Sequence, residues 1–501
     1  MTRLVQRPLW VVLALVFVAY VGVLGAGFVF DDHFLIEQNT VLTAPTFDTL
    51  FRRDLWCCAG AQPSAYYRPA TALSFLLDAK VWGLAPAGFH ATSLVLHLVA
   101  VALVAALLAP RIGVGRSAVA ALLFGLHPIQ SEAVAWVAAR NDPLVAVAAL
   151  GALLMLDRRT PAATAGAAAL TLLACLAKES GWMLPALAWC WRRAWGERLA
   201  RVEWGALLGG VALSLALRAQ VLWSPLGEEV GGRGQDPEAV LRAVATYLGW
   251  ILWPWPLTST LSAALLPPSP MAWVAAAVCV TLAVWATCRG GGWLILWAAV
   301  AFIPAVLGIT GYGLIGERYL YLPLFGVVAA VARVAPAGRG ALVALGAVTA
   351  AFVGVLHVRI PDWRSDVTLF AAADARLGDS TSRGLHAHAV EEAGDHTLAL
   401  RLYTEALTMS PVSRYSCAYV LPLAADQLPP DVFGEQVTRW GEGPCRRAPG
   451  FLPRAMKILV RKGQLGAADR LACLDPAVLH PREGACLTGG ADVVPGPPPE
   501  P

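Results

Sequence analysis

Phe28-Val29-Phe30-Asp31-Asp32 ends an apolar run that begins at Pro8, and His33 follows directly. Two adjacent carboxylates at the mouth of an apolar helix are costly to leave partly desolvated. They therefore indicate a titrating site or a metal site that faces an aqueous cavity. The alternative is that the two acids only mark where the helix leaves the bilayer, because acids are common at membrane surfaces.

Composition places the chain among membrane proteins. Of its 501 residues, 57% are hydrophobic and 14% are charged, whereas soluble domains carry about 25% charged residues. The formal net charge is +4, and the arginines are scattered in short groups and form no basic stripe. This distribution argues against nucleic acid as a partner.

The apolar runs predict about eleven transmembrane helices, since a span needs about 20 residues. The first run is longer than the apolar core of a signal peptide, so we expect a retained helix with its N-terminus inside. The other runs lie at 88–109, 116–135, 143–157, 161–177, 180–195, 204–223, 270–288, 292–310, 319–334 and 340–358. We expect Glu238–Trp253 to be a re-entrant or interfacial helix, because counting it as a span would reverse every later loop.

The arginines predict the orientation of these spans. If the runs alternate, one side receives Arg111, Arg116, Arg158, Arg159, the run Arg192–Arg201, Arg289, Arg333 and Arg339. Cytoplasmic loops are rich in Lys and Arg, so this side is the inside. The outside then receives the long loop 31–86, the turn His127–Asp142, Lys178-Glu179, the loop Ser224–Asp236, Gly311–Tyr321 and the whole C-terminal tail.

The tail is predicted to be a helical extracytoplasmic domain over residues 359–490, after a membrane domain over residues 1–358. Its clearest unit resembles half of a tetratricopeptide repeat, a helical hairpin with small residues at the helix contact and proline as the stop. That unit consists of Gly394, Ala399, Tyr403, Ala406 and Pro411, and a degenerate second unit contains Gly463 and Ala468. Residues 491–501 are predicted to be a disordered, proline-rich tip.

Four cysteines follow the last predicted span: Cys417, Cys445, Cys473 and Cys486. In an oxidising compartment an even number of cysteines is compatible with two disulfides, although the connectivity does not follow from sequence.

Charged residues gather in the predicted outside loops, where acid and base stand close together in four places. Arg68 precedes a segment with helical spacing that we expect to be interfacial. Glu132, Trp136 and Arg140 are four residues apart and would share one face of a helix, where an internal Glu–Arg pair is the structural alternative. The other two places are Lys178-Glu179 and Glu317-Arg318. A lysine between two spans suits a lipid phosphate at the bilayer surface.

Several short motifs carry a resemblance to a known family through their order. They are Phe28-Val29-Phe30-Asp31-Asp32, Tyr67-Arg68-Pro69 with Ser74-Phe75, Gly88-Phe89-His90 with His97, His127-Pro128 with Glu132-Ala133-Val134 and Arg140, Lys178-Glu179, and Glu317-Arg318-Tyr319-Leu320-Tyr321-Leu322-Pro323. The ordered set resembles the transmembrane and tetratricopeptide repeat O-mannosyltransferases, within the GT-C glycosyltransferase superfamily. The chain looks like a bacterial-type relative, and the resemblance covers about residues 20–411. It departs from the family in its tail, which has one clear repeat where the family usually has many.

The resemblance implies an all-α polytopic enzyme with a GT-C type bundle in the inner or plasma membrane and its active site outside. Such enzymes move a hexose, here most simply mannose, from a dolichyl or polyprenyl phosphate to an acceptor hydroxyl, here Ser or Thr of a protein. Asp31 or Asp32 would be the base. No cofactor is certain, and Mg²⁺ or Mn²⁺ bridging the two aspartates is an alternative, because hard cations favour carboxylates.

The resemblance also implies roles for the other charged residues. Positive charge must receive the leaving lipid phosphate; Arg318 and Lys178 are the first candidates, and Arg68 and Arg140 are the next. The remaining residues would line the sugar and acceptor pocket: His127, Glu132, Glu179, Glu317 and Tyr319.

Two other functions stay open at this level. One is transfer of the sugar to a lipid or a cell-surface glycan, and the other is a non-catalytic membrane scaffold that binds partners through its repeats. A transporter would place its charges at mid-bilayer between internal repeats, which the sequence lacks. A nucleotide-sugar donor is disfavoured, because no glycine-rich phosphate loop follows a strand-like run.

Overall fold

The structure is a computed structural model that describes residues 3–58, 64, 66–222, 237–258, 261–262, 270–312, 314–336, 338–410, 414–448, 450–472 and 474. Four sequence predictions lie outside the described residues: the loop Ser224–Asp236, the proline stop Pro411, the pair Cys473 and Cys486, and the tip 491–501. Contacts divide the chain into two compact units, Met1–Leu369 and Phe370–Pro501.

The described residues of unit 1 form helices, turns and one two-residue antiparallel pair, β1 (Leu261–Ser262) with β2 (Leu314–Ile315). Its α-helices are α1 (Arg3–Tyr20), α2 (Thr40–Thr43), α3 (Phe47–Phe51), α4 (Pro69–Trp82), α5 (Pro86–Ile112), α6 (Val114–Leu126), α7 (Ser131–Ala135), α8 (Asn141–Asp157), α9 (Pro161–Ala177), α10 (Leu184–Ala194), α11 (Arg201–Val221), α12 (Pro237–Leu252), α13 (Pro270–Ala286), α14 (Gly292–Tyr312), α15 (Pro323–Val334) and α16 (Arg339–Arg359). Short turns matter for the site: η2 (His33–Glu37), η4 (Val137–Arg140), η5 (Glu179–Met183), η9 (Glu317–Leu320) and η10 (Ile360–Arg364).

Local sequence explains where several helices begin and end. Proline is the first residue of α5 and of α9, where its missing N–H has no partner to lose. The Thr160 hydroxyl accepts from Ala163 N and so caps α9. Gly113 ends α5 with φ +84°, a left-handed conformation that glycine adopts without strain.

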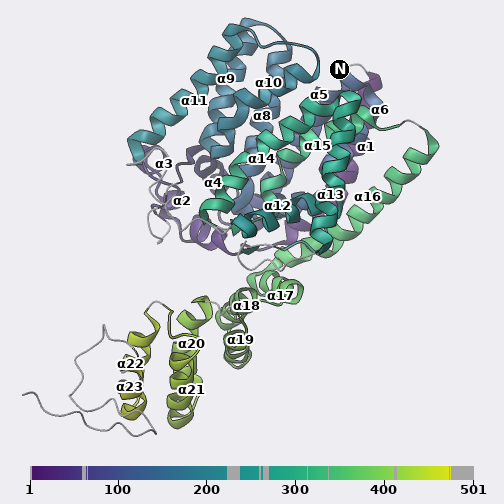
Figure 1. The fold of residues 1–501 in the computed structure, drawn as a ribbon. Coiled ribbons are helices and arrows are strands. Elements are labelled where there is room, and N and C mark those ends of the chain that lie inside the picture. The colour runs from purple at the N-terminus through teal and green to yellow at the C-terminus, as the bar shows by residue number, and fades with distance from the viewer. Residues whose placement is uncertain are drawn as a thin grey trace, which may run out of the picture. The chain divides into compact units, whose positions relative to one another are not determined.

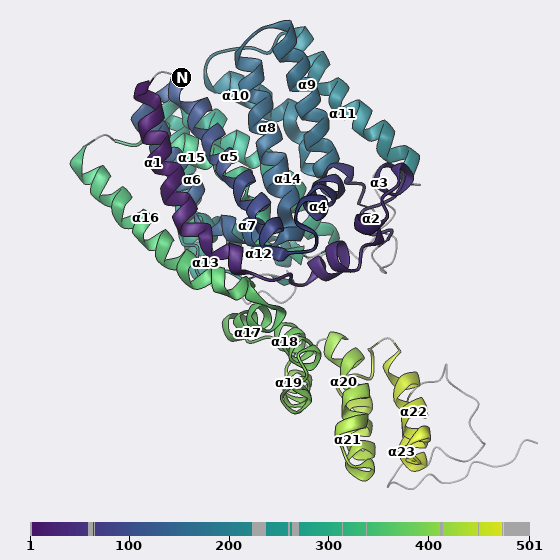
Figure 2. The same ribbon diagram turned by 180° about the vertical axis from the view of Figure 1, so that it is seen from behind.

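The long helices pack side by side. Figures 1 and 2 show α5 beside α1, α6 and α8, and α9 between α8 and α11. Small residues let these helices approach closely: Ala146, Ala149, Ala163 and Ala167 are buried in α8 and α9. A β-carbon at Gly210 of α11 would lie 3.0 Å from the Ala168 carbonyl oxygen of α9. Close backbone packing therefore builds the bundle that carries the site.

Six described segments are long and apolar enough to cross a membrane. They are Pro8–Gly25, Pro86–Ile112, Val137–Asp157, Arg201–Val221, Pro270–Thr310 and Arg339–Arg364, and the bent pair Val114–Leu126 with Pro128–Ala135 makes a seventh. The prediction of an all-α polytopic membrane protein is confirmed. The predicted count of about eleven spans is not confirmed.

The two counts differ because several apolar helices are short and because one long stretch is kinked. Helices α9, α10 and α15 have 17, 11 and 12 residues, fewer than the about 20 that a span needs. Pro270–Thr310 counts as one segment, although Gly290 interrupts it with φ +85° between α13 and α14. The segment Glu238–Trp253 forms α12, which is not among the candidate spans of the described residues, and its place at the membrane stays a prediction.

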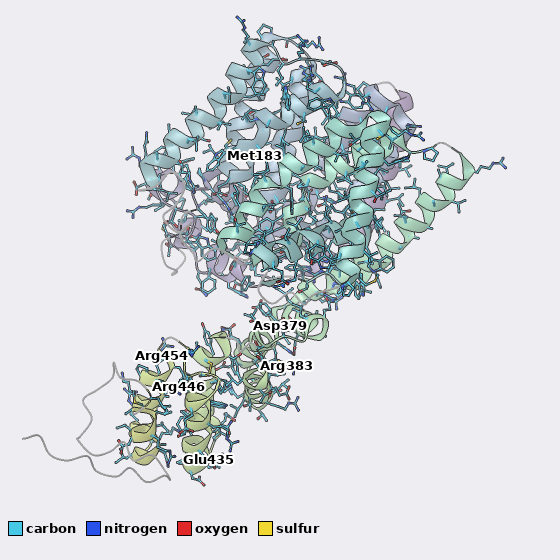
Figure 3. All side chains as sticks on the ribbon, in the orientation of Figure 1. Met183, Asp379, Arg383, Glu435, Arg446 and Arg454 are labelled. Atoms are coloured by element: carbon cyan, nitrogen blue, oxygen red, sulfur yellow. A yellow bond between two sulfur atoms is a disulfide. The ribbon has the colours of Figure 1, made fainter. Side chains whose placement is uncertain are left out.

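Unit 2 contains helical hairpins. Helix α17 (Asp366–Leu377) crosses the boundary and is followed by α18 (Ser380–Glu392), α19 (His396–Thr408), α20 (Arg414–Gln427), α21 (Pro430–Glu442), α22 (Phe451–Arg461) and α23 (Leu465–Ala472). Figure 3 labels Asp379 and Arg383 at the start of α18. Asp379 caps this helix by accepting from Thr381 N and Ser382 N, and Arg383 pairs with Asp374 of α17.

Hairpins form at both places where the sequence predicts repeat-like units. Gly394 has φ +94° in the turn between α18 and α19, and Ala399, Tyr403 and Ala406 are fully buried. Gly463, with φ +74°, turns the chain between α22 and α23. The hairpin pattern fits a tetratricopeptide repeat, but that assignment stays a prediction.

One disulfide joins Cys417 of α20 to Cys445, just after α21. Both cysteines belong to the set for which the sequence allows two disulfides.

Candidate active site

Asp32 is a structural anchor in this site. Its side chain is 0% exposed; Oδ1 accepts from Ala138 N at 2.7 Å and Oδ2 accepts from Val29 N at 3.2 Å. Burial raises the pKa of Asp32 to about 8, although these two backbone N–H groups oppose the shift. Because both oxygens bind backbone, Asp32 fixes its own turn to η4.

Asp31 has a different environment. It is half-buried, and burial raises its pKa to about 6, while the neighbouring Arg318 guanidinium lowers it. A carboxyl group with this pKa is ionised at neutral pH and takes up a proton more readily than an ordinary aspartate. Within the described residues, no group of three or more His, Cys, Asp or Glu is arranged to hold a metal ion. Mg²⁺ or Mn²⁺ at the two aspartates stays a prediction.

Arg318 lies in η9 and is bound to Glu132 of α7. Its Nη1 donates to Glu132 Oε1 at 2.5 Å, and its backbone N donates to Oε2 at 2.9 Å. The guanidinium lies 4.8 Å from the Trp136 ring and 4.7 Å from the Tyr319 ring. Glu132 is 0% exposed, so the acid of this ion pair is fully buried, and Arg318 Nη2 donates to the Tyr319 hydroxyl at 3.4 Å.

Lys178 reaches the same tyrosine from another helix end. Its Nζ donates to both oxygens of Asp142 at 2.6 and 2.7 Å and lies 5.0 Å from the Tyr319 ring centre. Ion pairing and cation–π contact together hold the ammonium in place. The structure therefore brings the two first-ranked phosphate candidates, Lys178 and Arg318, to one aromatic ring.

Arg68 and Glu179 form the next pair, with Arg218 as a third member. Arg68 Nη2 donates to Glu179 Oε2 at 2.6 Å, and Arg218 Nη1 donates to Oε1 at 3.2 Å. Burial would raise the pKa of Glu179, but the two arginines hold it below its usual value. Glu179 is thus a charged partner of two cations from α11 and from the start of α4. We name the ion pairs Arg68–Glu179, Lys178–Asp142 and Arg318–Glu132, with the tyrosine ring, the Tyr319 cluster.

The predicted shared helix face of Glu132, Trp136 and Arg140 is wrong. Helix α7 ends at Ala135, and Trp136 is extended, with ψ 115°, so the three residues do not follow one helical period. Glu132 turns to Arg318, whereas Arg140 Nη1 pairs with Asp78 at 2.6 Å.

Arg140 is 0% exposed and is enclosed by acceptors from two helices, α4 and α5. Its other N–H groups donate to Phe89 O at 2.6 Å and to Ser93 Oγ at 3.2 Å. A lipid phosphate would have to displace Asp78 to reach this guanidinium. Its position therefore favours a structural role over the predicted phosphate role.

His127 and Glu317 lie within packed contacts. His127 Nε2 is 3.1 Å from Ile251 O, and its ring lies 4.6 Å from Phe352. Glu317 is 0% exposed and accepts from Arg359 Nη2 at 2.8 Å. Both side chains are thus held in packed contacts, although the sequence predicts them in the pocket.

Sequence reasoning gave no role to several partners of the site: Asp78, Asp142, Arg218, Arg359 and Asp366. For Arg218 a signal exists, because an arginine inside an apolar run is itself an indication of a functional or paired charge. Arg359 and Asp366 flank the end of the last apolar run and carry no such signal.

Comparison with known proteins points to one family. No family model matches the chain, and no solved structure matches it. The chain is 40% identical over 136 residues to the protein O-mannosyl-transferase Tmtc1 of Drosophila melanogaster, which covers 26% of this chain and 16% of the relative. It is 30% identical over 197 residues to the protein O-mannosyl-transferase F38B6.6 of Caenorhabditis elegans, covering 37% and 28%. It is also 30% identical over 161 residues to human TMTC3, another protein O-mannosyl-transferase, covering 32% and 18%.

The matched region thus spans less than a third of each relative's own length. Over about a quarter to a third of its residues, this chain is related by sequence to the protein O-mannosyl-transferases, the family that its ordered motifs resemble.

Proposed function

We propose that this chain is a membrane glycosyltransferase of the GT-C type. It moves mannose from a dolichyl or polyprenyl phosphate to a Ser or Thr hydroxyl of a protein, on the extracytoplasmic face of the membrane. The names of its relatives support the mannose and the protein acceptor. The lipid-phosphate donor and the face rest on the arginine distribution and on the charged cluster at the helix ends.

The observation that carries this proposal is the contrast between the two aspartates. Asp32 uses both carboxylate oxygens on backbone N–H groups. Asp31 is half-buried, has a pKa raised to about 6 by burial, and lies within the field of Arg318. A general base works best when its pKa lies near the working pH. Asp31 is therefore the base, and Asp32 holds the turn that presents it.

The reaction follows from these positions. The acceptor oxygen attacks the anomeric carbon of the mannose while Asp31 takes the hydroxyl proton. The bond between that carbon and the phosphate oxygen breaks, and its electron pair leaves with the lipid phosphate. Arg318 and Lys178 both contact the Tyr319 ring. They stabilise the negative charge that develops on the leaving lipid phosphate. Arg68 forms an ion pair with Glu179, the residue that follows Lys178. It therefore adds its positive charge to the same region.

The test uses the purified full chain in lipid nanodiscs, with labelled polyprenyl phosphate mannose. A Ser/Thr peptide and a lipid acceptor are offered in separate reactions. Asp31→Asn is expected to lower kcat by about 10²–10⁴-fold, the usual contribution of a general base, with an unchanged unfolding midpoint. Asp32→Asn replaces one of the two accepting oxygens with an NH2 group, which cannot accept from the backbone N–H that faces it. This variant should therefore lower the unfolding midpoint instead.

Each alternative has its own outcome in this assay. Label in the lipid and none in the peptide would replace the protein acceptor with a lipid or glycan. No transfer by the wild-type chain from any lipid-phosphate sugar would favour the scaffold. Wild-type kcat in Asp31→Asn would remove Asp31 from the role of base.

A further inference from the structure

A short segment begins inside the last candidate span, Arg339–Arg364, ends just after it, and contacts the residues that flank Asp31 and Arg318. It comprises Arg359, η10 (Ile360–Arg364), Ser365 and Asp366, and we call it the strap. All of it belongs to unit 1. None of its residues is assigned a part in the reaction above.

Asp366 binds the loop of residues 27–33, which we call the aspartate loop, on both sides of the pair Asp31 and Asp32. Its Oδ1 accepts from Phe30 N at 2.8 Å, and its Oδ2 lies 2.8 Å from His33 Nε2. The other ring nitrogen of His33 is 2.5 Å from Glu37 Oε2. Hydrogen bonding to Asp366 and to Glu37 raises the pKa of His33 to about 9, so the imidazole is charged at neutral pH. The Asp366 carboxylate thus binds the residues on either side of the acidic pair, Phe30 and His33. We call these two contacts the bracket.

The backbone inside this bracket is strained. Phe30 has φ +53°, a left-handed conformation that is unfavourable for residues other than glycine. Such a conformation persists only where neighbouring contacts hold it. The bond from Phe30 N to Asp366 is one such contact, and the Phe30 ring, 5.8 Å from Trp136, is another.

A second tether joins the strap to the same loop through backbone alone. Gly27 N donates to Arg364 O at 3.1 Å. A β-carbon at Gly27 would lie 2.9 Å from that oxygen, closer than a real contact allows. Glycine is therefore required for the strap to lie this close to the aspartate loop.

The other end of the strap supports Arg318. Arg359 is 1% exposed; its Nη2 donates to Glu317 Oε1 at 2.8 Å and its Nη1 donates to Asp362 Oδ2 at 2.9 Å. Glu317 directly precedes Arg318. The Trp363 ring stacks on Trp136 at 6.3 Å, and Trp136 lies 4.8 Å from the Arg318 guanidinium. The strap thus reaches Arg318 through an ion pair and through two stacked rings.

We propose that the strap is a positioning element that sets the placement of Asp31 relative to Arg318, with Asp366 and Arg359 as its positioning residues. This inference rests on the proposed function, in which Asp31 takes the proton and Arg318 receives the leaving phosphate. A base and a leaving-group cation carried on separate loops must be held together for both to act on one substrate. Neither positioning residue contacts the reacting atoms; each acts through the residue it holds.

The test compares strap variants of the full chain in the mannose-transfer assay described above. Asp366→Asn keeps an acceptor for Phe30 N but removes the ion pair with His33, and Asp366→Ala removes both contacts. We expect kcat to fall about 10-fold in the first and about 100-fold in the second, since small displacements of reacting groups cost about this much. The KM for the lipid donor should stay within about twofold of wild type. Asp366→Glu should recover part of the lost rate.

The pH profile separates positioning from a general loss of folded protein. When the bracket is broken, Asp31 becomes more solvated, so the acidic limb of the kcat profile should move below pH 6, toward the value of an ordinary aspartate. Loss of folded enzyme would lower the rate equally at every pH. Gly27→Ala, which pushes the strap away from the other side, should give the same shift.

Arg364→Ala is the matched control, because its side chain is exposed and it joins the strap through its carbonyl oxygen. It should leave kcat and the pH profile unchanged. Wild-type kcat and an unmoved acidic limb in both Asp366→Ala and Gly27→Ala would overturn the inference while leaving the proposed function standing. Absence of transfer by the wild-type chain would overturn the proposed function itself.

Discussion

Two charged regions of unit 1 lie at opposite ends of helix α8 and are built differently. Asp142, at the start of α8, belongs to the Tyr319 cluster, and Asp157, at its end, belongs to a second region. About 22 Å of helix separates them, and Figure 1 shows α8 within the bundle. We call the second region the Arg192 network; its members are Arg111, Asp157, Arg159, Arg192, Glu197 and Glu203.

Sharing distinguishes the two regions. In the Arg192 network, Glu197 accepts from three arginines at 2.6 to 2.9 Å, and Arg192 binds both Glu197 and Glu203. In the Tyr319 cluster Glu179 also binds two arginines, Arg68 and Arg218, but Lys178 and Arg318 each have an acid of their own and share only a ring. A shared mesh of charges leaves little capacity for a ligand, whereas separate pairs around one aromatic ring can bind an additional anion. Under the proposed function, the Arg192 network at one end of α8 serves stability and the Tyr319 cluster at the other end serves the reaction.

The sharpest way to break this comparison is to neutralise one pair of the Tyr319 cluster. The double variant Glu132→Gln/Arg318→Gln removes both charges, so no unpaired charge stays buried. We expect mannose transfer to fall about 10²–10³-fold, the usual effect of losing a group that stabilises transition-state charge. Transfer is measured in nanodiscs, beside the thermal unfolding midpoint, which should stay close to wild type. Wild-type transfer by this variant would take the cluster out of the reaction.

Arg192→Ala probes the other end. Arg192 is 1% exposed, and its loss leaves Glu203 buried without its cation. We expect the free energy of unfolding to fall by about 3–5 kcal/mol, the range for breaking a buried ion pair. Unfolding in a detergent titration measures this loss. Transfer per folded molecule should equal wild type; a separate loss of kcat would show that the network also serves the reaction.

Activity and stability should also differ in their pH dependence, because they depend on different carboxyl groups. Burial holds the pKa of Asp31 at about 6, so kcat should fall about tenfold per unit below pH 6 and stay level above it. Burial would raise the pKa of Glu197, but hydrogen bonds from Arg111 and Arg192 lower it to about 2. Since this folded-state pKa is depressed, the stability from Glu197 is present above the ordinary pKa of 4.5 and is lost only as pH falls toward 2.

Activity and unfolding profiles recorded between pH 5 and 8 check this division. Transfer should change across that range while the contribution of Glu197 to stability does not. A transfer rate that is flat from pH 5 to pH 7 would contradict the assignment of Asp31.

Arg159→Ala should have the smallest effect. Its side chain is 63% exposed, and Glu197 keeps Arg111 and Arg192 as partners. We expect a change in unfolding free energy of less than about 0.5 kcal/mol and no change in transfer. A loss as large as that of Arg192→Ala would mean that the network does not share its charges.

Much of the site could be predicted because its signals are local. Acid and base stand together in the sequence at Lys178-Glu179 and Glu317-Arg318, and both places lie at helix ends in the structure. The small residues of α19 likewise predict the hairpin that forms there.

The partners of these residues could not be predicted in the same way. Arg140 pairs with Asp78, which lies on another helix, because the backbone becomes extended at Trp136 and breaks the helical period. Asp366 is 333 residues from His33 along the chain, and no periodicity connects positions that far apart. Sequence thus indicates which residues carry charge at a helix end, and only packing decides which charge meets which.

Helix α8 has a further consequence for how this protein can vary between relatives. Each residue of an α-helix turns the chain by about 100°. One residue inserted or deleted between Asp142 and Asp157 would therefore rotate one carboxylate away from its cation, even if every side chain were kept. Substitutions within α8 are tolerable where volume is preserved, but its length is fixed by two ion pairs at once. An alignment of relatives should accordingly show gaps in the loops around α8 and none within it.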